Sequence, residues 1–310
     1  MLKKFRQMSV LALTVVFIFT ACKKDEAPKN TDTETEVKAH NEDQNFVSSE
    51  MDAIINESIV SLESDGAFSG KMMDQQDINT LCNATAVADT SSNPWKITIT
   101  YNGNNCFNTH HRSGTVVLSM PAGTRWKNAG AALTITVQNL IVKRLSDNKQ
   151  IKINGTQTIT NVNGGLAYQL PVLNNITHTV NGTLSITFGN NTQRNWQVSR
   201  KKVFTYNNGV VLNVHGTGTD GNHTQLAEWG TNRFGHAFFT SITQPLVFRQ
   251  DCQLRLTAGE LKHQGFATST VTFGLNASGN PTGCPGTGNY YFKIVWTGPN
   301  GGSHQAIHPY

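Results

Sequence analysis

The chain has 310 residues, of which 15% are charged, and its formal net charge at pH 7 is +5. The positive charge is scattered along the sequence and forms no dense basic patch, so the composition gives no support to a nucleic-acid-binding protein. Charge is nevertheless divided unevenly. Residues 22–65 hold four lysines and twelve carboxylates, whereas residues 66–310 hold eighteen lysines and arginines and eight carboxylates. An acidic segment therefore precedes a basic body, which indicates either a surface for anionic polymers or a charge that keeps the domain soluble.

Residues 1–21 have the features of an export signal. Three basic residues precede an apolar run from Val10 to Thr20, and the small residues Thr20 and Ala21 come directly before Cys22. The apolar run is about half as long as the roughly 20 residues that a membrane-spanning helix needs. The segment is therefore predicted to be a lipoprotein signal peptide whose removal leaves Cys22 as an acylated N-terminus on a membrane.

The next two segments are predicted to be a tether and a helix. Residues 22–45 contain almost no large apolar side chain to bury, which favours a disordered acidic tether. Residues 46–66 carry apolar side chains at helical spacing, with Ser49 and Asp52 placed as a capping box, and this pattern predicts one short amphipathic helix. Its stripe is expected to dock on the body, although a partner protein could bind the same stripe. The stripe consists of Val47, Met51, Ile54, Ile55, Ile59 and Leu62.

Beyond Leu81 the hydrophobic period becomes two, which is typical of half-buried strands separated by Asn- and Gly-rich turns. No segment after residue 66 keeps a helical period over ten residues, so parallel strands joined by helices are not expected. Residues 67–310 are therefore predicted to be an all-β antiparallel meander. It could form one sandwich or open barrel, or two packed β units over about 67–175 and 176–310.

The cysteines predict two disulfides. With Cys22 acylated, four cysteines remain in a chain that is expected to reach an oxidising compartment. Four cysteines allow three pairings, and proximity along the chain together with similar flanking strands favours the pairs Cys82–Cys106 and Cys252–Cys284. Such bonds typically stabilise a fold by about 2–4 kcal/mol each. A four-ligand zinc site is not favoured, because paired close spacing is lacking.

Several stretches of the body resemble a widespread class of Bacteroidota lipoproteins. The matching stretches are Ile97–Gly103, Arg112–Gly114, Gly155–Asn161, Trp196–Arg200 and Gly230–Gly235, together with the four body cysteines. The cleavage box at 19–22 is similar to the looser boxes of this group, and Lys23–Glu26 is similar to its tag for export to the outer face of the outer membrane, although a solvated spacer would look the same. The resemblance implies β structure, acyl chains such as palmitate on Cys22 and an outer-membrane, cell-surface location. It implies no activity and no functional residue.

Catalysis is only weakly indicated. Asp220 and Glu228 are the best carboxylate pair for a glycan-active hydrolase, in a glycine-rich segment at 216–234 that is either a functional loop or a hairpin connection. His110 and His111 would point to opposite faces of a strand, and the other body histidines lack the spacing of metal ligands. No nucleophile elbow, phosphate-binding loop or triad spacing is present. We therefore expect no catalytic residue, cofactor or metal.

Binding is the function class that the sequence favours, with glycans, lipopolysaccharide or other anionic surface polymers as ligands. Strand alternation places Arg194 and Trp196 on one face with Arg200 and Lys202. They would form a basic stripe there, or, as the favoured alternative, Trp196 is buried in the core and the cations are only solvated. Alternatives are a structural or partner subunit of an outer-membrane assembly and a hydrophobic carrier with an internal cavity. The candidate ligand-binding residues, which include an expected exposed tryptophan at position 126, are Trp126, Arg125, Arg200, Lys201, Lys202, Trp229 and Arg233.

Overall fold

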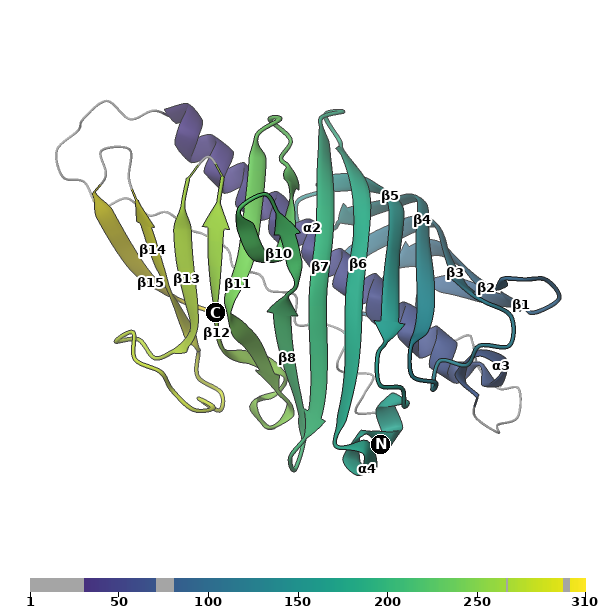
Figure 1. The fold of residues 1–310 in the computed structure, drawn as a ribbon. Coiled ribbons are helices and arrows are strands. Elements are labelled where there is room, and N and C mark those ends of the chain that lie inside the picture. Colours follow the sequence, from purple (N-terminus) through teal and green to yellow (C-terminus); the bar gives the residue numbers. More distant parts are fainter. Residues whose placement is uncertain (1–30, 71–80, 266, 298–301) are drawn as a thin grey trace.

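The computed structural model describes residues 31–70, 81–265, 267–297 and 302–310. The predicted signal peptide, the acylated Cys22 and the start of the predicted tether lie outside these residues. Within them, fifteen strands form an antiparallel sheet and one long helix lies near the N-terminus (Figure 1). The all-β prediction is therefore confirmed.

The strands form one continuous sheet in a mostly sequential order. Strands β1 to β7 pair in sequence order, β7 pairs with β10, and β10 to β15 again pair in sequence order. In addition, β8 pairs with both β7 and β11, and β9 pairs with β10. Strands β5 and β6 pair from Ile151 opposite Phe188 to Asn161 opposite His178, so the sheet continues across the predicted division at 175/176. The strands are β1 (Ala84–Asp89), β2 (Trp95–Asn104), β3 (His110–Met120), β4 (Ala131–Arg144), β5 (Gln150–Asn161), β6 (Asn175–Phe188), β7 (Gln193–Tyr206), β8 (Val210–Gly216), β9 (Gly218–Asp220), β10 (His223–Thr231), β11 (Ala237–Arg249), β12 (Arg255–Gln264), β13 (Ser269–Leu275), β14 (Tyr291–Thr297) and β15 (Ser303–Pro309).

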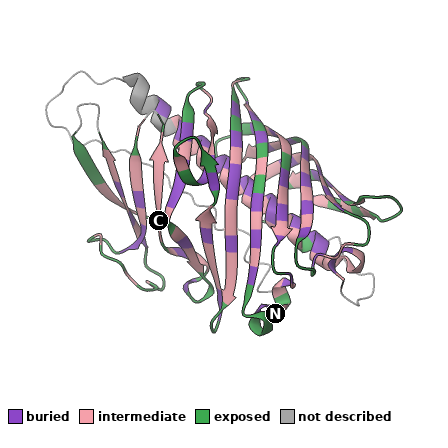
Figure 2. Cartoon of the chain, viewed as in Figure 1, coloured by how far each residue is buried: buried purple, intermediate pink, exposed green. Residues whose placement is uncertain are grey.

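The two faces of the sheet have different environments. Successive side chains of a strand point to opposite faces. On β4, Leu133 and Ile135 are fully buried, whereas Thr134 and Thr136 between and beyond them are half-buried. The same alternation appears as bands along the strands in Figure 2. We call the face against which the long helix packs the covered face, and the opposite face the open face.

A β-bulge in β4 interrupts the regular pairing. Asn139 has a φ of 48°, and the register shifts on both sides of β4 at this point. The facing residues on the neighbouring strands are the glycines Gly114 and Gly155. A Cβ on Gly114 would lie 2.5 Å from the carbonyl oxygen of Asn139, so the backbones approach more closely here than any other residue type permits.

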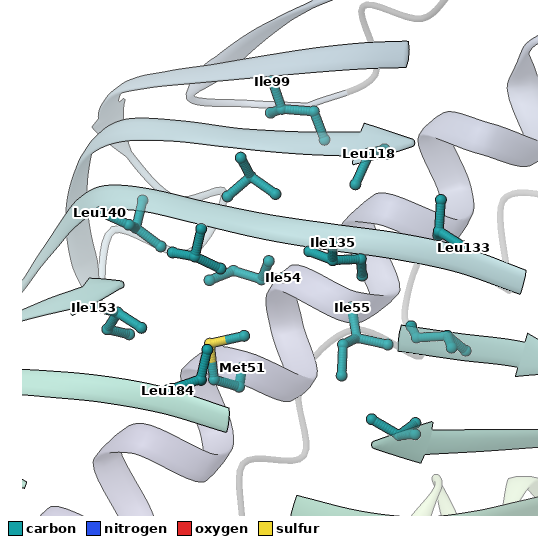
Figure 3. Packing of buried hydrophobic residues seen from close by; sticks show 14 of the residues in the cluster. Met51, Ile54, Ile55, Ile99, Leu118, Leu133, Ile135, Leu140, Ile153 and Leu184 are labelled. Carbon is teal, nitrogen blue, oxygen red and sulfur yellow. The ribbon is translucent and has the colours of Figure 1, made fainter. Parts of the chain in front are cut away.

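The long helix α2 (Thr31–Ser64) crosses the covered face diagonally and lies behind the strands in the view of Figure 1. Its 34 residues correspond to a length of about 51 Å. As predicted, the apolar stripe packs on the body: Met51, Ile54 and Ile55 point at side chains of the sheet such as Ile135 and Leu184 (Figure 3). Full burial of each such side chain contributes roughly 1.5–3 kcal/mol.

The helix starts much earlier than the sequence predicted. Residues 31–45 are helical, although they were expected to belong to the tether, and the helix ends at Ser64. This early part docks through polar side chains whose partners lie far away in the sequence, so hydrophobic periodicity gives no sign of it. Ser49 and Asp52 lie in the middle of the helix and form no capping box; the Ser49 hydroxyl donates to the Phe46 carbonyl at 3.1 Å.

Short helices complete the described elements. They are α3 (Gly66–Ser69), η2 (Ala167–Gln169), α4 (Leu170–Leu173) and η3 (Gln250–Cys252). Asp65 caps α3 because its carboxylate accepts the backbone N–H groups of Ala67 and Phe68. The α3 turn in turn holds Phe68 in the core beneath the end of the sheet.

Buried apolar side chains form two main cores. The larger one fills the space between α2 and strands β2 to β7. The smaller one lies among strands β8 and β10 to β14, where Phe273 and Phe292 pack against Tyr310. The Tyr310 hydroxyl closes this end by donating to the Leu256 carbonyl at 2.7 Å and accepting the Gly274 N–H at 2.9 Å.

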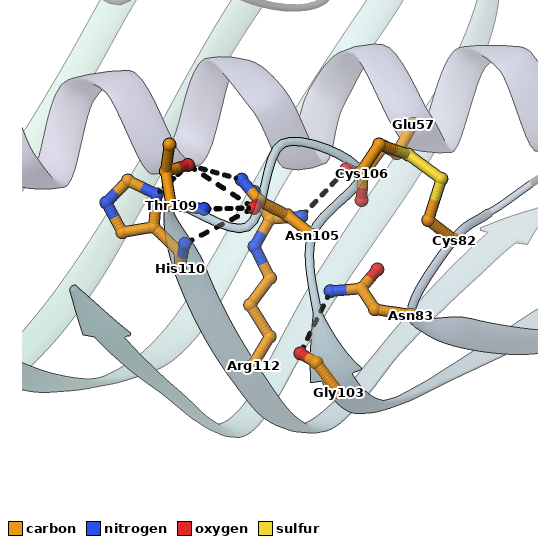
Figure 4. Close-up of a disulfide and its surroundings, with 9 residues drawn as sticks. All are labelled: Glu57, Cys82, Asn83, Gly103, Asn105, Cys106, Thr109, His110 and Arg112. Atoms are coloured by element: carbon orange, nitrogen blue, oxygen red, sulfur yellow. Dashed lines mark hydrogen bonds and ion pairs between the residues drawn. A yellow bond between two sulfur atoms is a disulfide. The ribbon is translucent and has the colours of Figure 1, made fainter. Parts of the chain in front are cut away.

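Both predicted disulfides are present. Cys82 and Cys106 are joined with a Cα–Cα distance of 5.2 Å, and the bond ties the start of the sheet to the β2–β3 hairpin (Figure 4). Cys252 and Cys284 are joined at the same Cα–Cα distance. Sequence proximity therefore gave the correct pairing among the three that were possible.

Candidate functional site

Acidic side chains of α2 meet cationic side chains of the sheet along the covered face. Arg112 of β3, only 1% exposed, donates to Glu50 at 2.9 Å and to Glu57 at 2.7 Å. The Tyr101 hydroxyl of β2 also donates to Glu57 at 2.7 Å. Figure 4 shows Glu57 above the Arg112 guanidinium. The acidic side chains of the helix thus neutralise cationic side chains of the sheet inside the molecule.

Glu228 of β10 is the centre of a second cluster. Its side chain is 5% exposed, and the Trp196 indole N–H donates to its Oε2 at 3.0 Å. The Arg200 guanidinium forms an ion pair with Oε1, to which the Ser48 hydroxyl of α2 donates at 2.6 Å. Every oxygen of the carboxylate therefore has a partner, which is the arrangement expected of a structural buried charge.

Asp52 of α2 belongs to the same cluster and lies on its more exposed side. Lys202 donates to it at 2.8 Å and Arg200 at 3.2 Å. Two cations that were predicted to bind an external ligand are consequently occupied by a carboxylate of the same chain.

A third cluster lies near the start of α2. Arg233 forms a bidentate ion pair with Asp43 and stacks over the Phe188 ring at 3.9 Å. Glu36 accepts a hydrogen bond from the Asn232 amide at 2.7 Å and lies 2.6 Å from His236 Nδ1. These contacts explain why the polar residues of early α2 are helical.

The predicted alternation along β7 is correct, but the face that it identifies is the covered one. Arg194, Trp196, Arg200 and Lys202 all point toward α2, and Lys201 points to the open face. The four side chains are buried or nearly so and do not form a stripe on the surface.

Trp126 is not the exposed aromatic residue that the sequence suggested. Its side chain is 0% exposed and its ring packs 5.2 Å from that of His178. Arg125 lies over the Trp95 ring at 4.8 Å and bonds to the Ala67 carbonyl. Both residues hold α3 against the sheet, and neither is placed to stack on a sugar.

The open face carries the lysines that remain free of ion pairs. Each stands between two strand residues that point to the covered face, as Lys152 does between Ile151 and Ile153. Within the described residues, none of these lysines has a carboxylate oxygen within salt-bridge distance. They are Lys96, Lys143, Lys152, Lys201, Lys262 and Lys293.

Hydroxyl and amide side chains surround these lysines in rows that cross neighbouring strands. Directly paired residues on adjacent strands lie about 5 Å apart, so a row offers closely spaced donors and acceptors. One row is Lys96, Ser119, Thr134, Thr158, Asn181 and Ser199. The next row is Thr98, Val117, Thr136, Thr156, Thr183 and Gln197.

An aromatic cluster continues the second row. Trp229 of β10 pairs with Gln197 on one side and with Phe239 on the other. Both rings are half-buried on the open face. Gly218 of β9 lies against the Trp229 ring, since a Cβ there would be 2.6 Å from it, and His223 stacks on Phe239 at a centroid distance of 3.8 Å. Of the predicted binding residues, Trp229 and Lys201 are thus the two that the fold leaves on the open face.

The two carboxylates of the candidate catalytic pair have different environments in the structure. Asp220 is exposed on β9, whereas Glu228 is buried and bonded to Arg200. As predicted, His110 and His111 point to opposite faces, with His110 stacked on Phe46 of α2. Glu228 is therefore a structural carboxylate and lacks the free oxygen that proton transfer to a substrate requires.

One group of possible metal ligands occurs among the described residues, at Asp251, Cys252 and Cys284. The two cysteines form a disulfide and Asp251 is bonded to Arg249, so the group offers no thiolate. A shallow depression of about 270 Å³ lies beside it, partly lined by the same Arg249–Asp251 pair. Neither feature has the donor set of a cofactor site.

No helix in the described part of the chain combines the length and hydropathy needed to cross a bilayer. No protein-family model, curated protein or solved structure matches the chain.

Proposed function

We propose that the chain is a lipid-anchored cell-surface protein that binds glycans or other anionic surface polymers on the open face of its sheet. The observation that carries this proposal is the different use of cations on the two faces. Most covered-face cations, namely Arg112, Arg200, Lys202 and Arg233, are paired with carboxylates of α2 or β10, whereas the six open-face lysines have no such partners in the described chain.

The open face has the chemistry that a polysaccharide needs. Hydroxyl and amide rows can exchange hydrogen bonds with sugar hydroxyls, and the accessible part of a half-buried ring such as that of Trp229 can contact the apolar side of a pyranose. Single exposed charge contacts are weak, so affinity would come from many contacts along one polymer chain.

The lipid anchor would set the position of this face relative to the membrane. Residues 22–30 can span at most about 30 Å when fully extended, so acylation at Cys22 would keep Thr31 within that distance of the bilayer. The start of α2 would then be held close to the membrane, and the sheet would be connected to the membrane through α2.

The proposal is tested by retention on immobilised lipopolysaccharide, an acidic polysaccharide and a neutral glycan, each at low and near-physiological salt. The test variant neutralises Lys143, Lys152 and Lys201 together as glutamines. We expect retention of the wild type on the acidic polymers at near-physiological salt and at least a tenfold loss for the variant.

The matched control removes the same charge from places off the open face. Lys127 bonds to the Gly70 carbonyl, Lys149 pairs with Glu42, and Arg144 pairs with Asp147 and stacks on Phe46 of α2. The triple variant Lys127→Gln, Arg144→Gln, Lys149→Gln should keep wild-type retention. Equal loss in both triples would mean generic electrostatics and would overturn an open-face site.

Trp229→Ala separates glycan recognition from charge. It should reduce retention on the neutral glycan with little change in salt dependence, because it removes stacking and leaves all lysines in place. Wild-type retention of this variant on every polymer would remove Trp229 from the proposed site.

A role as a partner subunit is the second candidate, and one surface favours it. The segment from Val162 to Thr177 contains no charged residue, and its exposed apolar side chains include Val172, 82% exposed, Tyr168 and Leu173. Exposed apolar patches often mark contacts with other proteins. The variant Val172→Asp, Leu173→Asp should abolish any co-purifying assembly, whereas retention on polymers should be unchanged if the two surfaces are independent.

A further inference from the structure

Among the described residues, Arg194 of β7 is a buried arginine to which no carboxylate is bonded. It is 1% exposed, and its Nη2 donates to the Gln44 side chain of α2. Its guanidinium lies 4.4 Å from the centre of the Phe238 ring. Nε and Nη1 are buried and have no hydrogen-bond partner among the described residues. Three N–H groups of a buried cation are therefore left without an acceptor.

The other arginines bound against α2 show what Arg194 lacks. Arg112, Arg200 and Arg233 each bond to at least one carboxylate of α2 or β10. Asp43 is the helix carboxylate whose charge acts on Arg194, and each of its two oxygens accepts a hydrogen bond from Arg233. Asp43 reduces the local charge but does not satisfy the free N–H groups of Arg194.

Two histidines lie beside the guanidinium. His40 of α2 packs 4.9 Å from Phe238 and 4.8 Å from His263 of β12, measured between ring centres. Both of its ring nitrogens are buried and have no hydrogen-bond partner in the part of the chain that the structure describes. His263 Nδ1 is 3.2 Å from the Thr240 hydroxyl. Burial, together with the charge of Arg194, lowers the pKa of His40 well below its usual value and that of His263 to about 4. Both rings are therefore neutral at pH 7.

The positive charge of Arg194 is not balanced by a carboxylate bonded to it among the described residues. Arg194 and Arg233 are cationic and Asp43 is anionic, while His40 and His263 are neutral. A neutral His40 still has one N–H to donate, in the same region as the free N–H groups of Arg194. Buried donors and an unbalanced charge are costly without a partner, and one small acceptor of charge −1 would meet both needs.

We propose that Arg194 and His40 bind a small monovalent anion, such as chloride, between α2 and the sheet. Its ligands are Arg194 Nε–H and Nη1–H and one His40 N–H. Because the site lies between the helix and the sheet, the anion stabilises the docked helix and is distinct from any polymer on the open face. The positive charge of Arg194 disfavours a cation at the same place.

The test follows the unfolding temperature of the full chain in detergent at fixed ionic strength, while gluconate is replaced by chloride or bromide. We expect a saturable rise of roughly 3 °C at a halide concentration about ten times the dissociation constant. Broadening of the ³⁵Cl resonance by the wild-type protein, reversed by bromide, gives a direct readout that needs no variant.

The variants locate the site. Arg194→Gln should lose both the halide-dependent rise and the ³⁵Cl broadening, and Arg125→Gln, which changes a partly buried arginine elsewhere on the covered face, should keep both. If Arg194→Gln does not fold, His40→Phe takes its place and should weaken chloride binding at least fivefold. A wild-type unfolding temperature independent of halide, with no excess ³⁵Cl linewidth, would mean that water fills the free N–H positions and would overturn the proposal.

Discussion

Replacing Glu228 by alanine tests whether the buried cluster holds the helix to the sheet. The change leaves the Trp196 indole N–H and the Ser48 hydroxyl without their acceptor, and it removes one of the two carboxylates bound to Arg200. Removing one partner of a buried ion pair costs about 3–5 kcal/mol. Because Asp52 still contacts Arg200, we expect the lower end, a loss of about 3 kcal/mol and a fall in unfolding temperature of about 6–12 °C.

Urea unfolding of three variants measures this loss. Glu228→Gln keeps a neutral acceptor for the indole and should lose about half as much as Glu228→Ala. Asp220→Ala removes an exposed carboxylate from the neighbouring β9 and should change the free energy of unfolding by less than about 0.5 kcal/mol. If Glu228→Ala were as stable as Asp220→Ala, the carboxylate would not be part of the helix–sheet contact, and a free, reactive role for it would return.

Three further predictions follow from other parts of the structure. Replacing Cys82 and Cys106 by serine should lower the free energy of unfolding in urea by about 3.5 kcal/mol, because the loop closed over a separation of 24 residues regains its entropy in the unfolded chain. Reductant should cause no further loss from this bond in the double variant. Burial, reinforced by a nearby lysine, lowers the pKa of His178 from 6.5 to about 4. Because the folded state favours neutral His178, the free energy of unfolding should fall by about 2–3 kcal/mol between about pH 6.5 and about pH 4.5, as measured by urea titration at each pH. His178→Phe should show a correspondingly smaller fall over the same pH range. Gly155→Ala should lower the free energy of unfolding by at least about 2 kcal/mol, because its Cβ would lie 2.4 Å from a backbone oxygen of the next strand. The control Gly123→Ala, also at positive φ but with nothing within 4 Å, should lower it by only about 1 kcal/mol. Similar losses in both variants would show that β5 and β6 are not so closely spaced.

The parts of the fold that depend on local patterns could be predicted from the sequence. Alternation along segments such as Leu133–Val137 gave the strands, and proximity gave the disulfides. The early part of α2 could not be predicted in this way. Its contacts, such as Asp43 with Arg233, join residues 190 positions apart, and a helix held by such ion pairs carries no hydrophobic stripe.

The candidate site shows the same limit. Alternation on β7 correctly grouped Arg200 with Lys202, but it could not say that a helix covers this face, because the helix was predicted to be short. The choice between lysine and arginine could have identified the covered face. Apart from Lys202, the strand lysines lie on the open face, while arginines such as Arg112 and Arg194 lie beneath α2. Arginine forms several fixed hydrogen bonds at a buried site, and lysine keeps its compact charge in water, so the two types separate between the faces.

The most direct test of this account is lysine acylation followed by mass spectrometry, with and without a bound acidic polysaccharide. In the free protein, we predict that Lys152 and Lys201 react readily and that Lys202, 9% exposed and bonded to Asp52, reacts slowly. Bound polymer should protect Lys152 and Lys201 and leave Lys202 unchanged. Fast reaction of Lys202 in the free protein would contradict the docked helix, and unprotected open-face lysines in the presence of bound polymer would contradict the open face as the binding surface.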